Sequence, residues 1–185
     1  MPLYLGIDTS NYTTSAALYD GGSGKLIQKK RLLPVKEGTL GLRQSDAVFE
    51  HVKQLGEMVN GVFAESGARE IAAVGVSNRP RDIDGSYMPC FLVGIMTAEC
   101  VAASHQAPIY LFSHQQGHVA AALYSAGRLN LLQTRFLAFH VSGGTTECLL
   151  VEPDKERIFR CDKIADSLDL KAGQAVDRVG VMLGL

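Results

Sequence analysis

Two histidines four residues apart, His114 and His118, are the strongest candidates for chemistry in this sequence. On a helix, positions i and i+4 share one face, with β-carbons about 6 Å apart. Two imidazoles can then converge on one metal ion, each at about 2.0–2.1 Å. The spacing alone is equally consistent with one histidine at the helix start and the other in the core. A HExxH zinc protease has a Glu as general base where Gln115 stands, so the segment argues against proteolysis.

Two hydroxyl-rich segments are candidate phosphate sites. The turn at residues 141–146, Val-Ser-Gly-Gly-Thr-Thr, lies between two expected strands, so it is neither a Walker loop nor a Rossmann fingerprint. Its backbone N–H groups could cradle a phosphate, although a plain hairpin explains it equally well. The segment from Asp8 to Thr14 holds the matching place earlier in the chain, and two such turns facing each other would clamp a polyphosphate or acyl-phosphate. We take Asp8 as the candidate catalytic carboxylate, with Thr9 and Ser10 as substrate contacts.

A glycine inside a predicted helix near residue 170 is a further candidate contact. Gly173 and Asp177 are four residues apart on one helix face, and Asp169 is placed to cap the helix. A helical glycine costs about 1 kcal/mol relative to alanine, which indicates close approach of a ligand or of another backbone. Tight helix packing would explain the same residue.

The elements that must position these residues alternate as βββ-α-β-α-β-α, then begin again. Ser45 is expected to cap the first long helix, which runs to Ser66. Hydrophobic periodicity and turn residues predict strands at 4–8, 13–18, 25–34, 71–77, 108–112, 136–141, 147–151 and 157–162, and helices at 45–66, 91–105, 114–126 and 169–183. Duplicated βββαβα units of RNase H type build the α/β actin/hexokinase-like fold. We therefore expect one complete unit at 1–130 and an incomplete second unit at 131–185.

Composition limits the class of protein. The 185 residues carry a net charge of −1, which argues against binding nucleic acid by bulk charge. Basic residues between 25 and 43 fit a solvated strand edge better than a patch that faces nucleic acid. Four cysteines without a CxxC pattern indicate reduced thiols, and no signal peptide or membrane-spanning stretch is evident, so we expect a cytoplasmic protein.

Five stretches carry a family resemblance, in the family's order and over nearly the whole chain. They read LGIDTSNYTTSAAL, PRDIDGSYMPCFLVGIMTAE, SHQQGHVAA, HVSGGTTECLL and SLDLKAGQAVDRVGVMLGL. Together they resemble the tRNA N6-adenosine threonylcarbamoyltransferases, once called O-sialoglycoprotein endopeptidases. That family has the actin/hexokinase-like fold, in agreement with the predicted elements.

The resemblance implies transfer of a threonylcarbamoyl group from its adenylate to N6 of adenosine 37 in tRNA. It makes His114 and His118 ligands of one divalent metal, iron or zinc. It also implies an adenylate or ATP-type nucleotide, tRNA and partner proteins of the threonylcarbamoylation machinery. The implied nucleotide contacts are Val141, Ser142, Gly143, Gly144, Thr145, Gly173 and Asp177.

Several departures from the family pattern indicate a divergent paralogue. Gln116 replaces a common Glu, Thr145 a common His, and Gln174 a common Glu. The family's third metal ligand, an Asp, lies outside this sequence. We therefore expect a truncated, inactive fragment, with a homodimer consistent with exposed strand edges. Two alternatives stay open: a non-catalytic nucleotide- or partner-binding scaffold, and a small-molecule kinase or carbamoyltransferase.

Overall fold

The computed structural model describes residues 2–10, 12–35, 42–142 and 144–184. The chain divides into two compact units, residues 1–117 and 118–185, and each is described by itself. The boundary between units that we expect near residue 130 stays a prediction. Within the described residues, no helix combines the length and the apolar character needed to cross a membrane.

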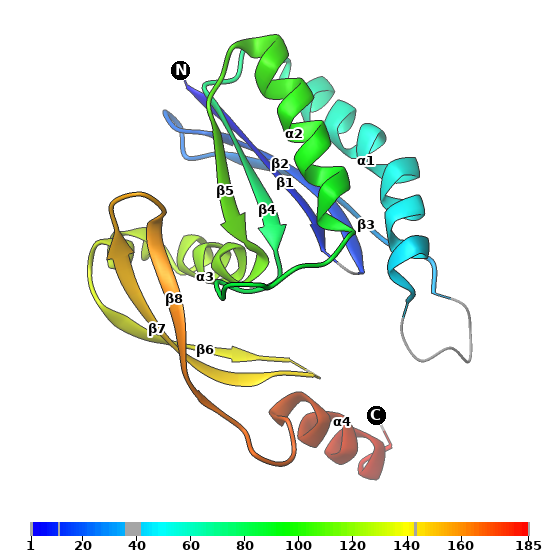
Figure 1. Ribbon diagram of the computed structural model, residues 1–185, viewed down its shortest axis with the longest axis vertical. Coiled ribbons are helices and arrows are strands. Elements are labelled where there is room, and N and C mark those ends of the chain that lie inside the picture. The colour runs from blue at the N-terminus through cyan, green and yellow to red at the C-terminus, as the bar shows by residue number, and fades with distance from the viewer. Residues whose placement is uncertain (1, 11, 36–41, 143, 185) are drawn as a thin grey trace. The chain divides into compact units, whose positions relative to one another are not determined.

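The first unit is built on a five-stranded sheet with the order β3-β2-β1-β4-β5 (Figure 1). The first three strands pair antiparallel, whereas β1 with β4 and β4 with β5 pair parallel. This is the strand order of one RNase H-type unit. The strands are β1 (Leu3–Ser10), β2 (Thr13–Asp20), β3 (Leu26–Leu32), β4 (Ala73–Arg79) and β5 (Ile109–Ser113).

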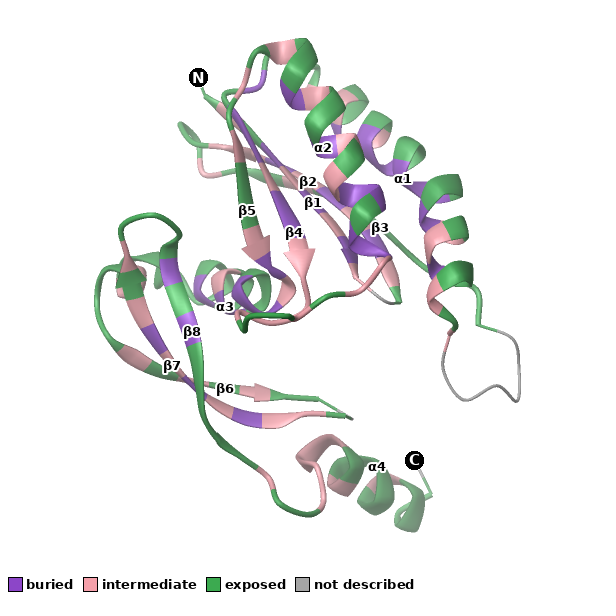
Figure 2. Cartoon of the chain, viewed as in Figure 1, coloured by how far each residue is buried: buried purple, intermediate pink, exposed green. Residues whose placement is uncertain are grey.

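Two helices, α1 (Gln44–Ser66) and α2 (Phe91–His105), lie side by side and cover one face of this sheet (Figure 1). Residues alternate along β1, so that Leu5 and Ile7 both point into the core. Helical spacing places Leu55, Val59 and Val62 of α1 on one buried face. Purple segments of β1, β4, α1 and α2 in Figure 2 mark the buried residues of this core.

The second unit is a three-stranded antiparallel sheet with the order β6-β7-β8, followed by a helix. Its core joins residues of β7 and β8 to the C-terminal part of α3, namely Leu149, Val151, Phe159, Cys161, Val119 and Leu123. The elements are α3 (His114–Ser125), which spans the boundary between the units, the 3-10 helix η1 (Leu129–Gln133), β6 (Phe136–Val141), β7 (Thr146–Asp154), β8 (Ile158–Asp166) and α4 (Ala172–Met182).

The predicted order of strands and helices is confirmed, but both predicted helix caps are wrong. Helix α1 begins one residue before Ser45, with Arg43 as its N-cap and the Ala47 N–H donated to the Arg43 carbonyl. Helix α4 begins three residues after Asp169, with Lys171 as its N-cap. Its first N–H is donated to the hydroxyl of Thr146 on β7 instead, so a tertiary contact replaces the local cap.

Candidate functional site

The first candidate site pairs a carboxylate at the end of β1 with an imidazole at the start of α3. The Nδ1 atom of His114 lies 3.2 Å from both Oδ1 and Oδ2 of Asp8. Because β1, β4 and β5 run parallel, their carboxyl ends meet at one edge of the sheet, where α/β folds place their sites. The side chains are 24% exposed for Asp8 and 31% for His114, so a ligand can reach the pair.

Burial and three neighbouring residues decide the charge state of Asp8. Burial by itself raises the pKa of the carboxyl group. The hydrogen bond and charge of His114, together with hydrogen bonds from the hydroxyls of Ser77 and Ser10, outweigh burial and hold the pKa below its usual 3.8. Asp8 is therefore an ionised acceptor at neutral pH, and Ser10 contacts this carboxylate from the same strand.

A reciprocal pair of hydrogen bonds fixes the first turn of α3, which carries His114. The side-chain oxygen of Gln116 accepts the Ser113 N–H at 2.7 Å, and the Ser113 hydroxyl accepts the Gln116 N–H at 3.1 Å. This is a capping box, and both residues are buried. The S-x-x-Q pattern typical of a capping box stands in the sequence at residues 113–116, so a local signal for it exists.

Thr9, an expected substrate contact, is fully buried and ties β1 to the start of α2. Its hydroxyl donates to the Cys90 carbonyl at 2.9 Å and accepts the Gly94 N–H at 3.2 Å. The observed contacts therefore give Thr9 a structural role, and its contact with substrate stays a prediction.

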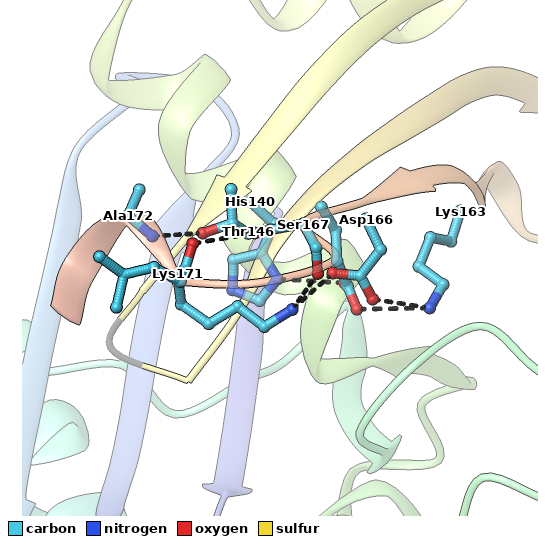
Figure 3. A network of polar contacts seen from close by, with 9 residues as sticks. His140, Thr146, Lys163, Asp166, Ser167, Lys171 and Ala172 are labelled. Atoms are coloured by element: carbon cyan, nitrogen blue, oxygen red, sulfur yellow. Dashed lines mark hydrogen bonds and ion pairs between the residues drawn. The ribbon is translucent and has the colours of Figure 1, made fainter. Parts of the chain in front are cut away.

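The second candidate site is the turn between β6 and β7 together with the start of α4. The Ser142 N–H donates to the Thr145 carbonyl at 2.7 Å, which closes a hairpin turn. The Thr146 hydroxyl accepts the Ala172 N–H at 2.8 Å, so the hairpin lies beside the first turn of α4, which carries Gly173 (Figure 3). Two predicted substrate-binding segments about 30 residues apart in sequence are thus neighbours.

The other expected residues of this site differ in exposure. Val141, Ser142, Gly144 and Asp177 are exposed, whereas Thr145 and Gly173 are partly buried. Gly143 lies outside the described residues. Exposed polar groups and backbone N–H groups in a hairpin turn beside a helix start are suited to bind an anion.

A lysine–aspartate–lysine bridge supports the second site. Asp166, at the end of β8, accepts hydrogen bonds from Lys163 at 3.1 Å and from Lys171 at 2.9 Å (Figure 3). Lys171 also donates to the Ser167 carbonyl at 2.7 Å. The hydrogen bonds from Lys171 and Lys163 lower the pKa of Asp166 to about 2. This bridge links the end of β8 to the residue before α4. No sequence motif predicts it.

His118 has a neighbour that the sequence did not suggest. Its ring lies 5.5 Å, centroid to centroid, from that of His140 on β6, with the planes tilted by 32°. The Nδ1 atom of His140 is 3.9 Å from a carboxylate oxygen of Glu147, whose side chain is 1% exposed. His140 on β6 and Glu147 on β7 are partners in the strand register, which brings their side chains together.

The donor chemistry of the predicted metal ligands can be judged from this geometry. His114 and His118 stand four residues apart on the continuous helix α3, and the Asp8 carboxylate faces Nδ1 of His114. A carboxylate behind the ring is the usual support of a metal-ligating histidine, so the chemistry of His114 with Asp8 fits that role. Among the residues described here, no cluster of three or more His, Cys, Asp or Glu side chains is placed to hold an ion. The third protein ligand stays a prediction.

Comparison with solved structures defines the fold class. A structure described as YeaZ from Pseudomonas aeruginosa matches 90% of this chain and 66% of its own, with a TM-score of 0.56 and 16% identity. The ethanolamine utilization protein EutJ from Carboxydothermus hydrogenoformans matches all of this chain and 58% of its own, with a TM-score of 0.51 and 13% identity. With the observed strand order, these similarities confirm the actin/hexokinase-like fold.

Sequence comparison then identifies the family. The family model for tRNA N6-adenosine threonylcarbamoyltransferase matches residues 36–185, and the chain belongs to this family. Proteins with that description from Brucella canis and Brucella suis are 30% identical over 188 aligned positions, which cover 98% of this chain. The chain spans 49% of their length, or about half of each relative.

Proposed function

We propose that the protein containing this chain transfers a threonylcarbamoyl group from its adenylate to N6 of adenosine 37 in tRNA. Membership of the transferase family supports the reaction class. The observation that carries the proposal is the contact between Asp8 and His114, 106 residues apart, at the sheet edge where α/β folds place their sites. A carboxylate beside the second ring nitrogen is a common partner of a metal-ligating histidine.

His114 and His118 would hold a divalent metal, iron or zinc, through their ring nitrogens. Bound there, the metal would polarise the carbamoyl carbonyl as a Lewis acid. The capping box of Ser113 and Gln116 fixes the turn of α3 that carries His114. The residues of this chain therefore orient the ligands, while the third protein ligand would come from sequence beyond this chain.

The hairpin of residues 142–145 and the start of α4 would bind the adenylate. Backbone N–H groups at a turn and at a helix start favour a phosphate, and the hydroxyls of Ser142 and Thr145 add donors. The bridge between Asp166 and its two lysines holds this region in place. Gly173 is the second residue of α4, and Asp177 follows one turn later.

Reconstitution tests this proposal. The complete protein that carries this chain, with its partner proteins, is mixed with threonylcarbamoyl-adenylate and tRNA, and the nucleosides are analysed by mass spectrometry. We expect N6-threonylcarbamoyladenosine at position 37, its loss in His118→Ala, and no product from the 185-residue chain alone. A complete protein that gives no product while a bacterial relative is active in the same assay would refute the transferase. ATP hydrolysis stimulated by a metabolite would instead identify a small-molecule kinase.

A further inference from the structure

We propose that Asp8 is a positioning residue, which fixes the tautomer of His114 so that Nε2 carries the ring's lone pair. The inference deepens the proposed function and rests on it only for the identity of the ligand that Nε2 binds. It gives Asp8 a specific role in place of the general catalytic role expected from the sequence.

The geometry at Nδ1 selects the tautomer. An ionised carboxylate only accepts hydrogen bonds, so the nitrogen that faces it must carry the proton. Both carboxylate oxygens of Asp8 lie 3.2 Å from Nδ1 of His114. In the neutral ring, a proton on Nδ1 leaves the lone pair on Nε2.

Two hydroxyls near Asp8 favour its ionised form. Those of Ser77, on β4, and Ser10, on β1, help to lower the pKa of the carboxyl group. Neighbouring Thr9 anchors the same strand to the start of α2. The contact of the carboxylate with Nδ1 of His114 therefore suits a residue that acts through the imidazole.

Packing limits the other freedom of the imidazole, which is rotation of its ring. Phe91, the first residue of α2, is 2% exposed, and its ring centroid lies 6.5 Å from that of His114 at an interplanar angle of 53°. The buried Phe91 ring restricts one side of the imidazole, and Asp8 holds one edge. A fixed ring and a fixed tautomer together aim Nε2 in one direction.

An isosteric substitution separates a tautomer role from a purely structural one. In Asp8→Asn, the hydroxyls of Ser77 and Ser10 favour the side-chain oxygen as acceptor. The amide NH₂ is then left to face His114 and donates to Nδ1, which moves the ring proton to Nε2. Asparagine has the same shape as aspartate, so the fold should be retained. The ring proton of His114, however, should move from Nδ1 to Nε2.

The test is ¹⁵N NMR of the histidine rings in the metal-free chain at pH 8, with His114 assigned by loss of its signals in His114→Gln. We expect His114 of the unsubstituted chain to be the Nδ1–H tautomer, and Asp8→Asn to shift it predominantly to Nε2–H. Ser77→Ala and His118→Ala are matched controls that keep the carboxylate and should keep the tautomer.

Metal affinity, measured with zinc against a chromophoric chelator, gives a second readout. Asp8→Asn is expected to weaken zinc binding by about 10–100-fold, as for other supporting carboxylates. An Nε2–H tautomer in the unsubstituted chain would overturn the inference, and this measurement does not depend on whether a variant folds. An unchanged tautomer in Asp8→Asn would overturn it as well. If the tautomer behaves as expected but zinc does not bind even the complete protein, the positioning role stands and the metal-assisted function fails.

Discussion

Ser113 and Gln116 show how individual side chains prepare the candidate site. Each accepts the other's backbone N–H, and both side chains are buried at the start of α3. The family resemblance presents Gln116 as a departure from a common Glu. The structure explains the residue, because a neutral amide completes the same capping box as a carboxylate.

Loss of the capping box should destabilise the chain. Gln116→Ala leaves the buried Ser113 N–H without its acceptor, at a cost of about 1–3 kcal/mol in the free energy of unfolding. Ser113→Ala removes the other half and should cost about 1 kcal/mol. Urea denaturation followed by circular dichroism measures both, with the exposed Gln133→Ala as control. Equal stability of Gln116→Ala and Gln133→Ala would show that the box contributes nothing.

Helix α2 approaches β1 so closely that one position tolerates no side chain. A β-carbon at Gly94 would lie 2.8 Å from the Thr9 hydroxyl oxygen and 3.4 Å from side-chain atoms of Ile7 and Val76. At Gly56, in the exposed face of α1, a β-carbon would meet nothing within 4 Å. Two helical glycines that look alike in the sequence therefore have opposite requirements.

These two glycines form a matched pair for mutation. Gly94→Ala should destabilise the chain by about 1–3 kcal/mol, because the added methyl displaces α2 from β1. Gly56→Ala should stabilise it by about 0.5–1 kcal/mol through helix propensity alone. The midpoints of thermal unfolding should move in opposite directions. A shift of the same sign in both variants would contradict the close packing of α2 on β1.

At the scale of the whole molecule, paired charges explain why a basic strand need not bind nucleic acid. Lys29 of β3 pairs with Glu65 of α1, and Arg31 makes a two-pronged contact with Glu57 at 2.7 Å. These exposed pairs contribute little to stability. They neutralise two of the cations considered for a tRNA-facing patch, which favours the solvated-edge interpretation.

A buried histidine links the stability of the first unit to pH. His51 of α1 is 0% exposed, and its Nδ1 lies 2.8 Å from the Thr14 hydroxyl of β2. Desolvation lowers its pKa from 6.5, although the Ser10 backbone and the charge of Asp8 oppose the shift. The folded state therefore prefers the neutral ring. The contribution of His51 to the free energy of unfolding is complete above pH 6.5, where the ring is neutral in the unfolded chain as well.

We expect stability to fall as the pH drops below 6.5, where the unfolded chain binds a proton that the folded chain resists. The loss should level off once the pH passes the lowered pKa. His51→Asn can keep a hydrogen bond to Thr14 but does not titrate, so this part of the pH dependence should disappear. Urea denaturation between pH 5 and pH 8 measures the effect, and an unchanged slope in the variant would contradict it.

Local pattern was sufficient to predict the order of elements, since strands and helices follow from spacing of apolar residues and from turn chemistry. The strand at Phe136–Val141 and the helix at Phe91–His105 have the predicted bounds. Cap positions failed because the α4 start is satisfied by Thr146 rather than by Asp169. Helix ends depend on which partner reaches the terminal N–H groups, and that partner can be distant in sequence.

The sequence by itself determined the fold class, the family and the histidine pair His114 and His118, because these depend on periodicity, motif order and spacing along one helix. Only the tertiary structure decided that Asp8 faces His114, that Thr9 is buried under α2, and that the hairpin of β6 and β7 meets α4. The physical reason is the range of the interactions. Periodicity is local, whereas hydrogen bonds between side chains 106 residues apart form only when strand pairing and helix packing bring them together.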